Sequence, residues 1–192
     1  MINEAEAQDA VKKLLSAMDI EPDRHTDLEN TPARVVKMLS EVWQGEQFTN
    51  DEIAAMFGKT FDSEESDMIV VTDIPCFSYC EHHLALIYNL KISVGYLPHG
   101  KIIGLSKIAR IADMVCRRLQ LQEKICADIA DIMIKIVGGD VIVFAQGEHS
   151  CMTARGIKKA GTVTKTLACR GRFKSESCRR DFFETLRLKQ WL

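Results

Sequence analysis

Two short clusters of reactive side chains, far apart in the chain, place the strongest constraint on its fold. The first, Cys80-Glu81-His82-His83, sets a thiol, a carboxylate and two imidazoles in four consecutive residues. The second, Glu148-His149-Ser150-Cys151, supplies another thiol and another imidazole. If the fold brings the clusters together, Cys80, one of the two adjacent histidines and Cys151 form three ligands for a divalent metal. A fourth position open to water is typical of catalytic zinc rather than structural zinc.

Other uses of these cysteines are less well supported. A structural zinc finger needs a second close pair of ligands, and Cys151 has no cysteine or histidine just downstream. Cys76 could pair with Cys80 in such a finger, but it follows Pro75 in an apolar stretch that favours a small core residue. The His-x-Glu and Pro-Cys-x-x-Cys pattern of zinc deaminases is absent. A disulfide between Cys80 and Cys151 under oxidising conditions remains an open alternative.

Composition indicates a globular protein that carries its own core. A chain of 192 residues with 46% hydrophobic content is long enough for one domain, or one domain with a small appendage. No apolar run reaches the roughly 18 residues that span a bilayer, and the first residues are acidic where a signal peptide is basic. We therefore expect a cytoplasmic protein that does not bind membranes. Seven cysteines in such a chain favour reduced thiols or metal ligands over a disulfide framework.

Charge is distributed unevenly along the chain. Residues 1–75 contain 17 acidic and 6 basic side chains, whereas residues 149–192 contain 11 basic and 3 acidic ones. This asymmetry fits an anion-binding surface for a nucleotide phosphate or a nucleic acid, but also a solvated face or one that pairs with another subunit. Aromatic residues are 7% of the chain and do not alternate with the C-terminal cations. We therefore expect no nucleic-acid partner, because stacking platforms are missing.

Periodicity divides the chain into a helical region with a linker, 1–66, and a mixed domain, 67–192. Apolar residues recur at helical spacing before residue 20, and Thr31-Pro32 opens a second helix. Arg34 and Lys37 lie three residues apart on that helix and therefore project from nearly one face. From periodicity alone, ordinary surface charge explains them equally simply. The polar stretch 58–67 is typical of a linker.

The mixed domain has the expected order β-β-α-α-β-β followed by a helix. The expected strands are 68–74, 84–97, 140–145 and 162–170, with a turn at 98–100 between the second strand and the helices. Between the strand pairs, apolar residues recur at helical spacing after Gly104 and again up to Gly138. A short helix over 181–188 closes the chain. The first cluster of ligands then lies on the connection between two strands, and the third strand leads into the second cluster.

The two central helices each begin with residues that suit a nucleotide. Ser106 is a plausible N-cap, and with Lys107 and Arg110 it would form a phosphate cradle at a helix N-terminus. A capped helix with two surface cations explains the same residues. Glu123 lies near the start of the next helix, where its negative charge would interact favourably with the helix dipole. Alternatively, its carboxylate would accept two hydrogen bonds from guanine, which offers N1–H and an exocyclic amino group.

Five segments in register resemble the GTP cyclohydrolase I family over about residues 30–185. They are Thr31 to Met38, Cys80 to Leu84, Gly104 to Ile111, Arg118 to Glu123 and His149 to Gly156. The resemblance implies an α+β tunnelling fold (T-fold), self-association as a homodecamer, and active sites between subunits. It also implies that zinc is the cofactor and GTP the substrate, and that hydrolysis opens the guanine imidazole ring. The products would be formate and 7,8-dihydroneopterin triphosphate.

The resemblance also assigns roles to individual residues. It implies that Cys80, His83 and Cys151 bind zinc, and that His82 and His149 transfer protons near the purine. Gln122 and Glu123 match the positions that recognise guanine. The positions that hold triphosphate and ribose are matched by Arg34, Lys37, Ser106, Lys107, Arg110 and Arg155.

One segment departs from the family pattern, and one other function is kept as an alternative. After the first cluster, residues 85–90 replace the family's usual proline, phenylalanine and glycine and contain an apparent extra residue, so we expect the strand or bulge geometry there, and not the ligand set, to differ from the family pattern. The alternative function is a non-catalytic, zinc-stabilised T-fold regulator or scaffold. Such a relative is expected to lose His82 or His149, and both are present.

Overall fold

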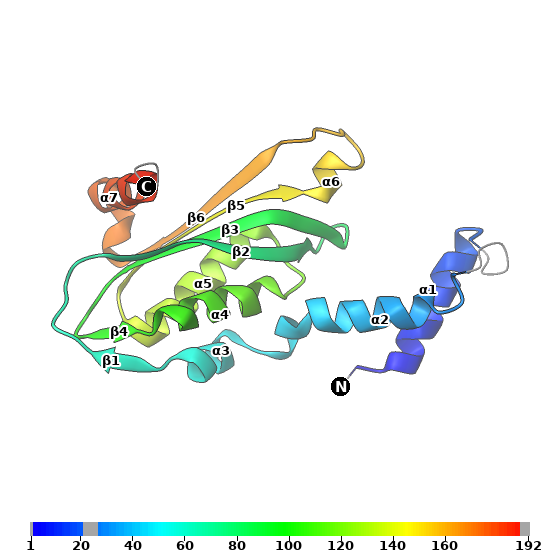
Figure 1. Ribbon diagram of the computed structural model, residues 1–192, viewed down its shortest axis with the longest axis horizontal. Helices are drawn as coiled ribbons and strands as arrows, with labels where there is room; N and C mark the ends of the chain where they lie inside the picture. The colour runs from blue at the N-terminus through cyan, green and yellow to red at the C-terminus, as the bar shows by residue number, and fades with distance from the viewer. Residues whose placement is uncertain (1, 21–26, 189–192) are drawn as a thin grey trace. The chain divides into compact units, whose positions relative to one another are not determined.

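The chain forms two compact units, Met1–Gln44 and Gly45–Leu192. The computed structural model describes residues 2–20 and 27–188 (Figure 1). Helix α3 (Asn50–Phe57) packs on the central helices of the second unit, so that unit begins upstream of the boundary expected between residues 66 and 67. The division into domains at that position stays a prediction.

The first unit contains two helices, α1 (Glu4–Ala17) and α2 (Thr31–Val42). The side chain of Asn3 accepts a hydrogen bond from Glu6 N and so caps α1. Pro32 lies in the first turn of α2, where its missing N–H costs no helical hydrogen bond, and this agrees with the sequence prediction. Both Arg34 and Lys37 are exposed on α2.

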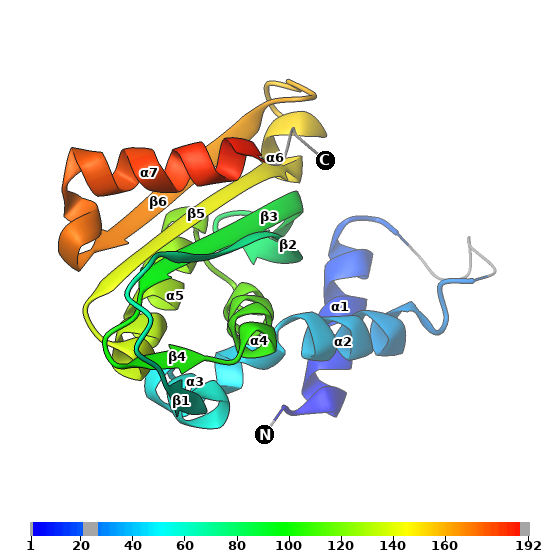
Figure 2. The ribbon, with the colours of Figure 1, turned by 60° about the vertical axis from the view of Figure 1, so that its left-hand side comes forward.

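The second unit is built on one antiparallel sheet of four strands in the order β2-β3-β5-β6. The strands are β2 (Ile69–Cys80), β3 (Ala85–Leu97), β5 (Asp140–His149) and β6 (Val163–Arg170). Between the two strand pairs run α4 (Leu105–Cys116) and α5 (Gln122–Val137), which lie on one face of the sheet (Figures 1 and 2). The predicted order β-β-α-α-β-β is confirmed.

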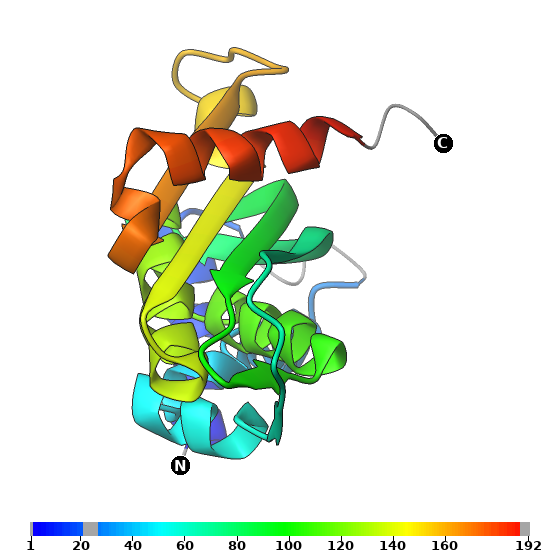
Figure 3. The same cartoon turned by 90° about the vertical axis from the view of Figure 1, so that its left-hand side faces the viewer.

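Several short elements and the longer helix α7 complete this unit. They are a 3₁₀ helix η2 (Gln44–Gln47), β1 (Thr60–Asp62), β4 (Lys101–Ile103), α6 (Ser150–Thr153), a second 3₁₀ helix η3 (Gly171–Lys174) and α7 (Glu176–Arg187). Strand β1 pairs with β4, so the expected linker over 58–67 contains a strand that sequence reasoning missed. Helix α7 lies on the sheet face opposite α4 and α5 (Figure 3). No helix in the described part of the chain is long and apolar enough to cross a membrane.

Alternation along the strands builds a core on each face of the sheet. Val141, Val143 and Ala145 of β5 are buried in the main core with α4 and α5, whereas Ile142 packs on the other face with Phe182 of α7. Gly95 of β3 allows that close packing, because an added Cβ would lie 2.8 Å from the Phe182 ring. The sheet is therefore covered on both faces at one end.

Candidate metal centre and active site

The register of the sheet brings the two ligand clusters together. Cys80 ends β2 and pairs with Ala85 of β3, and Ile87 of β3 pairs with His149 at the end of β5. Because β3 lies between β2 and β5, the turn after β2 and the residues after β5 meet at the same end of the sheet. Two clusters that are distant in sequence thus become neighbours in space.

Three side chains at this end could hold a metal ion. The Sγ atoms of Cys80 and Cys151 and a ring nitrogen of His83 all lie within 4.8 Å of one another. Tetrahedral zinc bonds of about 2.3 Å to sulfur and about 2.0 Å to nitrogen place ligand atoms about 3.5–3.8 Å apart, so only small movements separate this arrangement from a coordination sphere. Cys80 is buried and His83 is exposed, which leaves the site accessible from solvent.

The surroundings of Cys151 set its protonation. Burial raises the pKa of the Cys151 thiol, the neighbouring Cys80 raises it further, and the positive charge of Arg155 lowers it by a smaller amount. A bound divalent cation strongly favours the thiolate, which is the form that coordinates metal. Arg155 also donates a hydrogen bond of 3.1 Å to His83 Nε2, so this guanidinium lies directly beside the three ligands. All described cysteines are free thiols.

The two adjacent histidines have different positions. A turn closed by a hydrogen bond from His83 N to Cys80 O carries both of them, and their rings meet edge to face with centroids 6.3 Å apart. Only His83 reaches the two cysteines. His82 is exposed beside it, where a ligand over the site could meet its ring.

His149 lies next to the start of α5. The Nε2 atom of His149 is 2.8 Å from Oε1 of Gln122. The imidazole also interacts electrostatically with the Glu123 carboxylate. Burial lowers the pKa of His149, and the Glu123 carboxylate raises it by a smaller amount. Glu123 is exposed, whereas the side chain of Gln122 is buried. A half-buried imidazole and an exposed carboxylate therefore lie close together at the start of α5.

The residues of α4 that are expected to bind phosphate lie far from the candidate metal site of the same chain. Helix α4 begins beside β4, at the end of the sheet away from α6 and Cys151 (Figure 1). Its N-cap is Gly104 and not Ser106, because Lys107 N already bonds Gly104 O at 2.8 Å and the helix begins at Leu105. The structure therefore does not bring Ser106 and Lys107 to the candidate metal ligands of the same chain.

The atypical segment 85–90 forms a β-bulge that braces the second cluster. Pairing between β3 and β5 shifts register between Tyr88 and Lys91, and Asn89 has φ +49°. Asn89 Nδ2 donates to Glu148 Oε1 at 2.9 Å, and the Tyr88 hydroxyl lies 2.9 Å from Thr153 Oγ1 of α6. The bulged segment thus connects β3 to the turn of helix that carries Cys151, through Tyr88 and Thr153.

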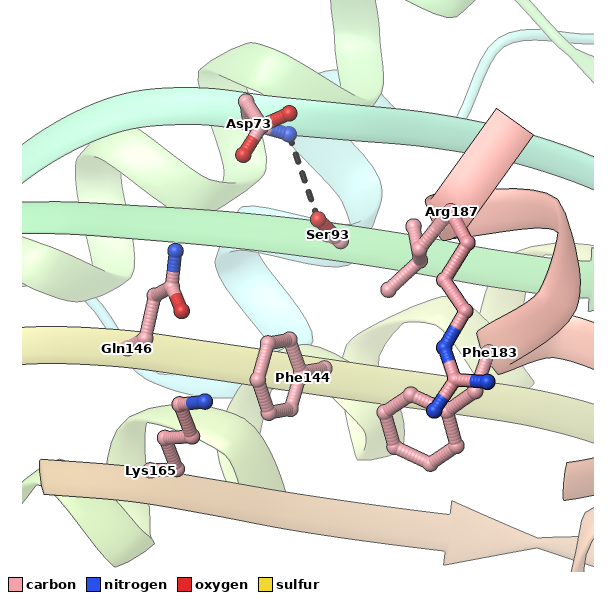
Figure 4. A pocket seen from close by; sticks show the side chains of 8 residues that line it. Asp73, Ser93, Phe144, Gln146, Lys165, Phe183 and Arg187 are labelled. Carbon is pink, nitrogen blue, oxygen red and sulfur yellow. Dashed lines mark hydrogen bonds between the residues drawn. The ribbon is translucent and has the colours of Figure 1, made fainter. Parts of the chain in front are cut away.

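A separate hollow of about 680 Å³ lies over the sheet face that α7 partly covers (Figure 4). Phe144 and Phe183, with ring centroids 5.5 Å apart, form part of its apolar wall. The Ser93 hydroxyl there accepts a hydrogen bond from Asp73 N at 3.2 Å. None of the residues expected to bind metal or GTP lines this hollow.

Comparison with known proteins identifies the family. A family model described as GTP cyclohydrolase I matches residues 7–187. A Clostridium acetobutylicum protein named GTP cyclohydrolase 1 is 52% identical over 172 residues, covering 86% of this chain and 88% of that protein. Proteins of the same name from Clostridium botulinum and Clostridium beijerinckii are 53% and 51% identical, covering 88% and 91% of this chain and 89% and 91% of their own lengths. With its T-fold order of strands and helices, this chain belongs to the GTP cyclohydrolase I family.

Proposed function

We propose that this protein is an active GTP cyclohydrolase I, which converts GTP and water to formate and 7,8-dihydroneopterin triphosphate. The observation that carries the proposal is the grouping of Cys80, His83 and Cys151 within 4.8 Å, at the end of the sheet where His149 and Glu123 also lie. Ligands for a Lewis acid beside a proton-transfer group and a carboxylate suit hydrolysis at a purine carbon. The names of the relatives support the same activity.

The ligand set fits zinc. Two thiolates and an imidazole are ligands that zinc prefers, and no fourth histidine, cysteine or carboxylate joins the group among the described residues. A zinc ion held by Cys80, His83 and Cys151 would supply Lewis-acid activation of a water molecule that attacks C8 of guanine.

Two histidines then transfer protons. His149 donates a proton towards N7, which makes C8 more electrophilic and allows the C8–N9 bond to break. The resulting formamide is hydrolysed to formate by a second water molecule. His82, exposed beside the ligands, exchanges protons as the ribose ring opens, the sugar rearranges and the pterin ring closes with loss of water.

Other residues bind the substrate. The exposed carboxylate of Glu123 accepts hydrogen bonds from N1–H and the exocyclic amino group of guanine, a pair of donors that adenine lacks. Arg155, beside His83, lies near enough to meet the ribose or the triphosphate. The remaining triphosphate and ribose ligands in this proposal are Arg34, Lys37, Ser106, Lys107 and Arg110.

A complete site requires a second copy of the chain. Helix α4 has 12 residues and so spans about 18 Å, and its cationic N-terminus lies at the end of the sheet away from α6. Because one GTP molecule must meet both the metal ligands and these cations, Ser106 and Lys107 would come from a neighbouring subunit. A closed ring, such as the decamer that the family resemblance implies, satisfies this requirement.

The activity is tested by incubating zinc-loaded protein with GTP and measuring formate and pterin fluorescence. We expect both products from the native chain and loss of both from His149→Ala with zinc fully bound. His99→Gln is the matched control, since His99 pairs with Asp140 near the turn after β3. Zinc binding without any product from the native chain would refute the enzyme and favour the scaffold alternative.

The shared site is tested by mixing two inactive variants in one assembly. Cys151→Ala lacks a metal ligand and Lys107→Ala lacks a phosphate ligand, so each alone should be inactive. If each site combines two chains, co-expressed variants regain about a quarter of the native sites by random assortment. No recovery in mixed assemblies would place the whole site within one chain. Native mass spectrometry of the same samples gives the number of subunits.

A further inference from the structure

Gln122 is turned into the protein and not towards the open site. It is the first residue of α5, and its side chain is 1% exposed against β5 and β6. Its Nε2 group lies 3.1 Å from Thr164 O, 3.2 Å from Thr166 Oγ1 and 3.4 Å from Ala145 O. On its other side, Oε1 lies 2.8 Å from His149 Nε2. The amide thus bridges β5 and β6 to the histidine.

These neighbours fix the orientation of the amide. The carbonyl oxygens of Thr164 and Ala145 can only accept hydrogen bonds, so the NH₂ group of Gln122 must face them. Turning the amide by 180° would place its oxygen against two other oxygens in a buried site, which is unfavourable. Oε1 therefore faces His149, and because an amide oxygen only accepts, His149 Nε2 must carry the hydrogen.

We propose that Gln122 is a positioning residue that holds the His149 ring with Nε2–H turned into the protein and Nδ1 presented to the purine. Nδ1 has no hydrogen-bond partner among the described residues, so it is the nitrogen available to a ligand. The orientation of a histidine is commonly set in this way by the hydrogen bond that its other nitrogen makes. This inference rests on the proposed function, because Nδ1 is then the ring nitrogen that, once protonated, donates to the unprotonated N7 of the purine.

This assignment separates the roles of two adjacent residues. The family resemblance leads us to expect both Gln122 and Glu123 at guanine, but neighbouring side chains on a helix point about 100° apart. The Gln122 amide uses both of its N–H groups and its oxygen inside the protein. The exposed Glu123 is left to recognise the base. Loss of the Gln122 side chain should therefore slow the chemical step and leave base selection unchanged.

Steady-state kinetics with two substrates distinguish positioning from recognition. For Gln122→Leu we expect kcat to fall by about 10–100-fold, with KM for GTP within about twofold and an unchanged preference for GTP over ITP, which lacks the exocyclic amino group. Gln122→Glu should recover much of kcat, because a buried, protonated carboxyl keeps one acceptor and one donor. Gln146→Leu, an amide on the opposite sheet face, is the matched control and should be silent.

A second variant guards against simple loss of folding. Thr166→Val removes one acceptor of the Gln122 amide while leaving the glutamine in place, so a smaller fall in kcat is expected with KM again unchanged. Zinc content and thermal unfolding are measured for every variant. A larger KM for GTP and a weaker preference over ITP in Gln122→Leu would overturn the proposal and make Gln122 a guanine ligand.

The state of the His149 ring can be read without any turnover. Solid-state ¹⁵N NMR of zinc-loaded protein with labelled histidine reports which ring nitrogen carries the hydrogen, and the spectrum of His149→Gln assigns the signal. We expect the Nε2–H form in the native protein and a mixture of both forms in Gln122→Leu. A native Nδ1–H form would overturn the proposal. A native Nε2–H form with no product from GTP would instead refute the proposed function alone.

Discussion

Arg118 forms the most extensively bonded buried charge in the described structure, and its removal gives a sharp test of what holds the second unit together. The side chain is 9% exposed and donates to Asp128 Oδ2 at 2.9 Å and Asn50 Oδ1 at 2.8 Å. It also donates to the main-chain oxygens of Phe48 at 2.7 Å and Gly45 at 3.3 Å. One guanidinium therefore ties η2 and the start of α3 to α4 and α5.

The magnitude follows from what Arg118→Met leaves behind. Removing one partner of a buried ion pair costs about 3–5 kcal/mol, because the other charge stays buried. Asp128 keeps Lys124, whose Nζ lies 2.6 Å away and whose side chain is 58% exposed, so we expect the lower end, about 3 kcal/mol. This loss is a large part of the roughly 5–15 kcal/mol that stabilises a typical domain.

The adjacent residue provides the control. Arg117 pairs with Asp113 on the surface and also approaches the Phe77 ring, so Arg117→Met should cost only about 1 kcal/mol. Both variants are unfolded in guanidinium chloride and followed by circular dichroism at equal protomer concentration, since self-association adds to stability. Equal losses for the two arginines, or a loss below about 1 kcal/mol for Arg118→Met, would refute the reasoning.

Three further predictions concern the thiols and the brace of α6. Cys151→Ala should abolish stoichiometric zinc binding measured by elemental analysis. The control Cys178→Ala, on α7, should retain it. Equal zinc content in the two variants would remove Cys151 from the ligand set. Tyr88→Phe removes the hydroxyl that contacts Thr153, so zinc affinity in a chelator competition should fall by about tenfold, and an unchanged affinity would deny the brace a role. Burial raises the pKa of the Cys126 thiol to about 11, so from pH about 9 to about 11 the unfolded chain has lost a proton that the folded chain keeps. The free energy of unfolding should then fall with pH by up to about 1.4 kcal/mol per unit more steeply than in Cys126→Ala, and parallel curves would contradict this.

Strong periodic signals made most of the fold predictable. The run of isoleucines from 125 to 136 predicted α5, and the β-branched strands around it predicted the sheet. Strands β1 and β4 have three residues each, too few to show an alternation, so no local pattern indicated that 60–62 pairs with 101–103. The prediction that Ser106 is the N-cap of α4 was wrong. Serine suits a cap by propensity, but the chain enters the helix two residues earlier, with Gly104 as the N-cap.

The chemistry of the site was visible in the sequence, but its orientation was not. Cys80, Cys151 and the pair His82-His83 indicated a metal site, because thiols and imidazoles are the ligands that zinc prefers, and the family resemblance selected His83 from the pair. Which way Gln122 points depends on Thr164 and Thr166, more than 40 residues away on β6, and on the pairing of that strand with β5. The row of threonines on β6 was the available signal for a polar contact with α5.

Sequence alone therefore determined the order of strands and helices, and it supplied the candidate metal ligands and the two histidines expected to transfer protons. Local patterns suffice for these, since residue type and spacing carry the information. The tertiary structure decided which of these residues lie close to one another. The placement of β3 between β2 and β5 brought the two clusters together, and the burial of Gln122 against β6 turned its amide towards His149. The distant start of α4 separated Ser106 and Lys107 from the candidate metal ligands of the same chain. These contacts are long-range, and only the pairing register of the sheet fixes them.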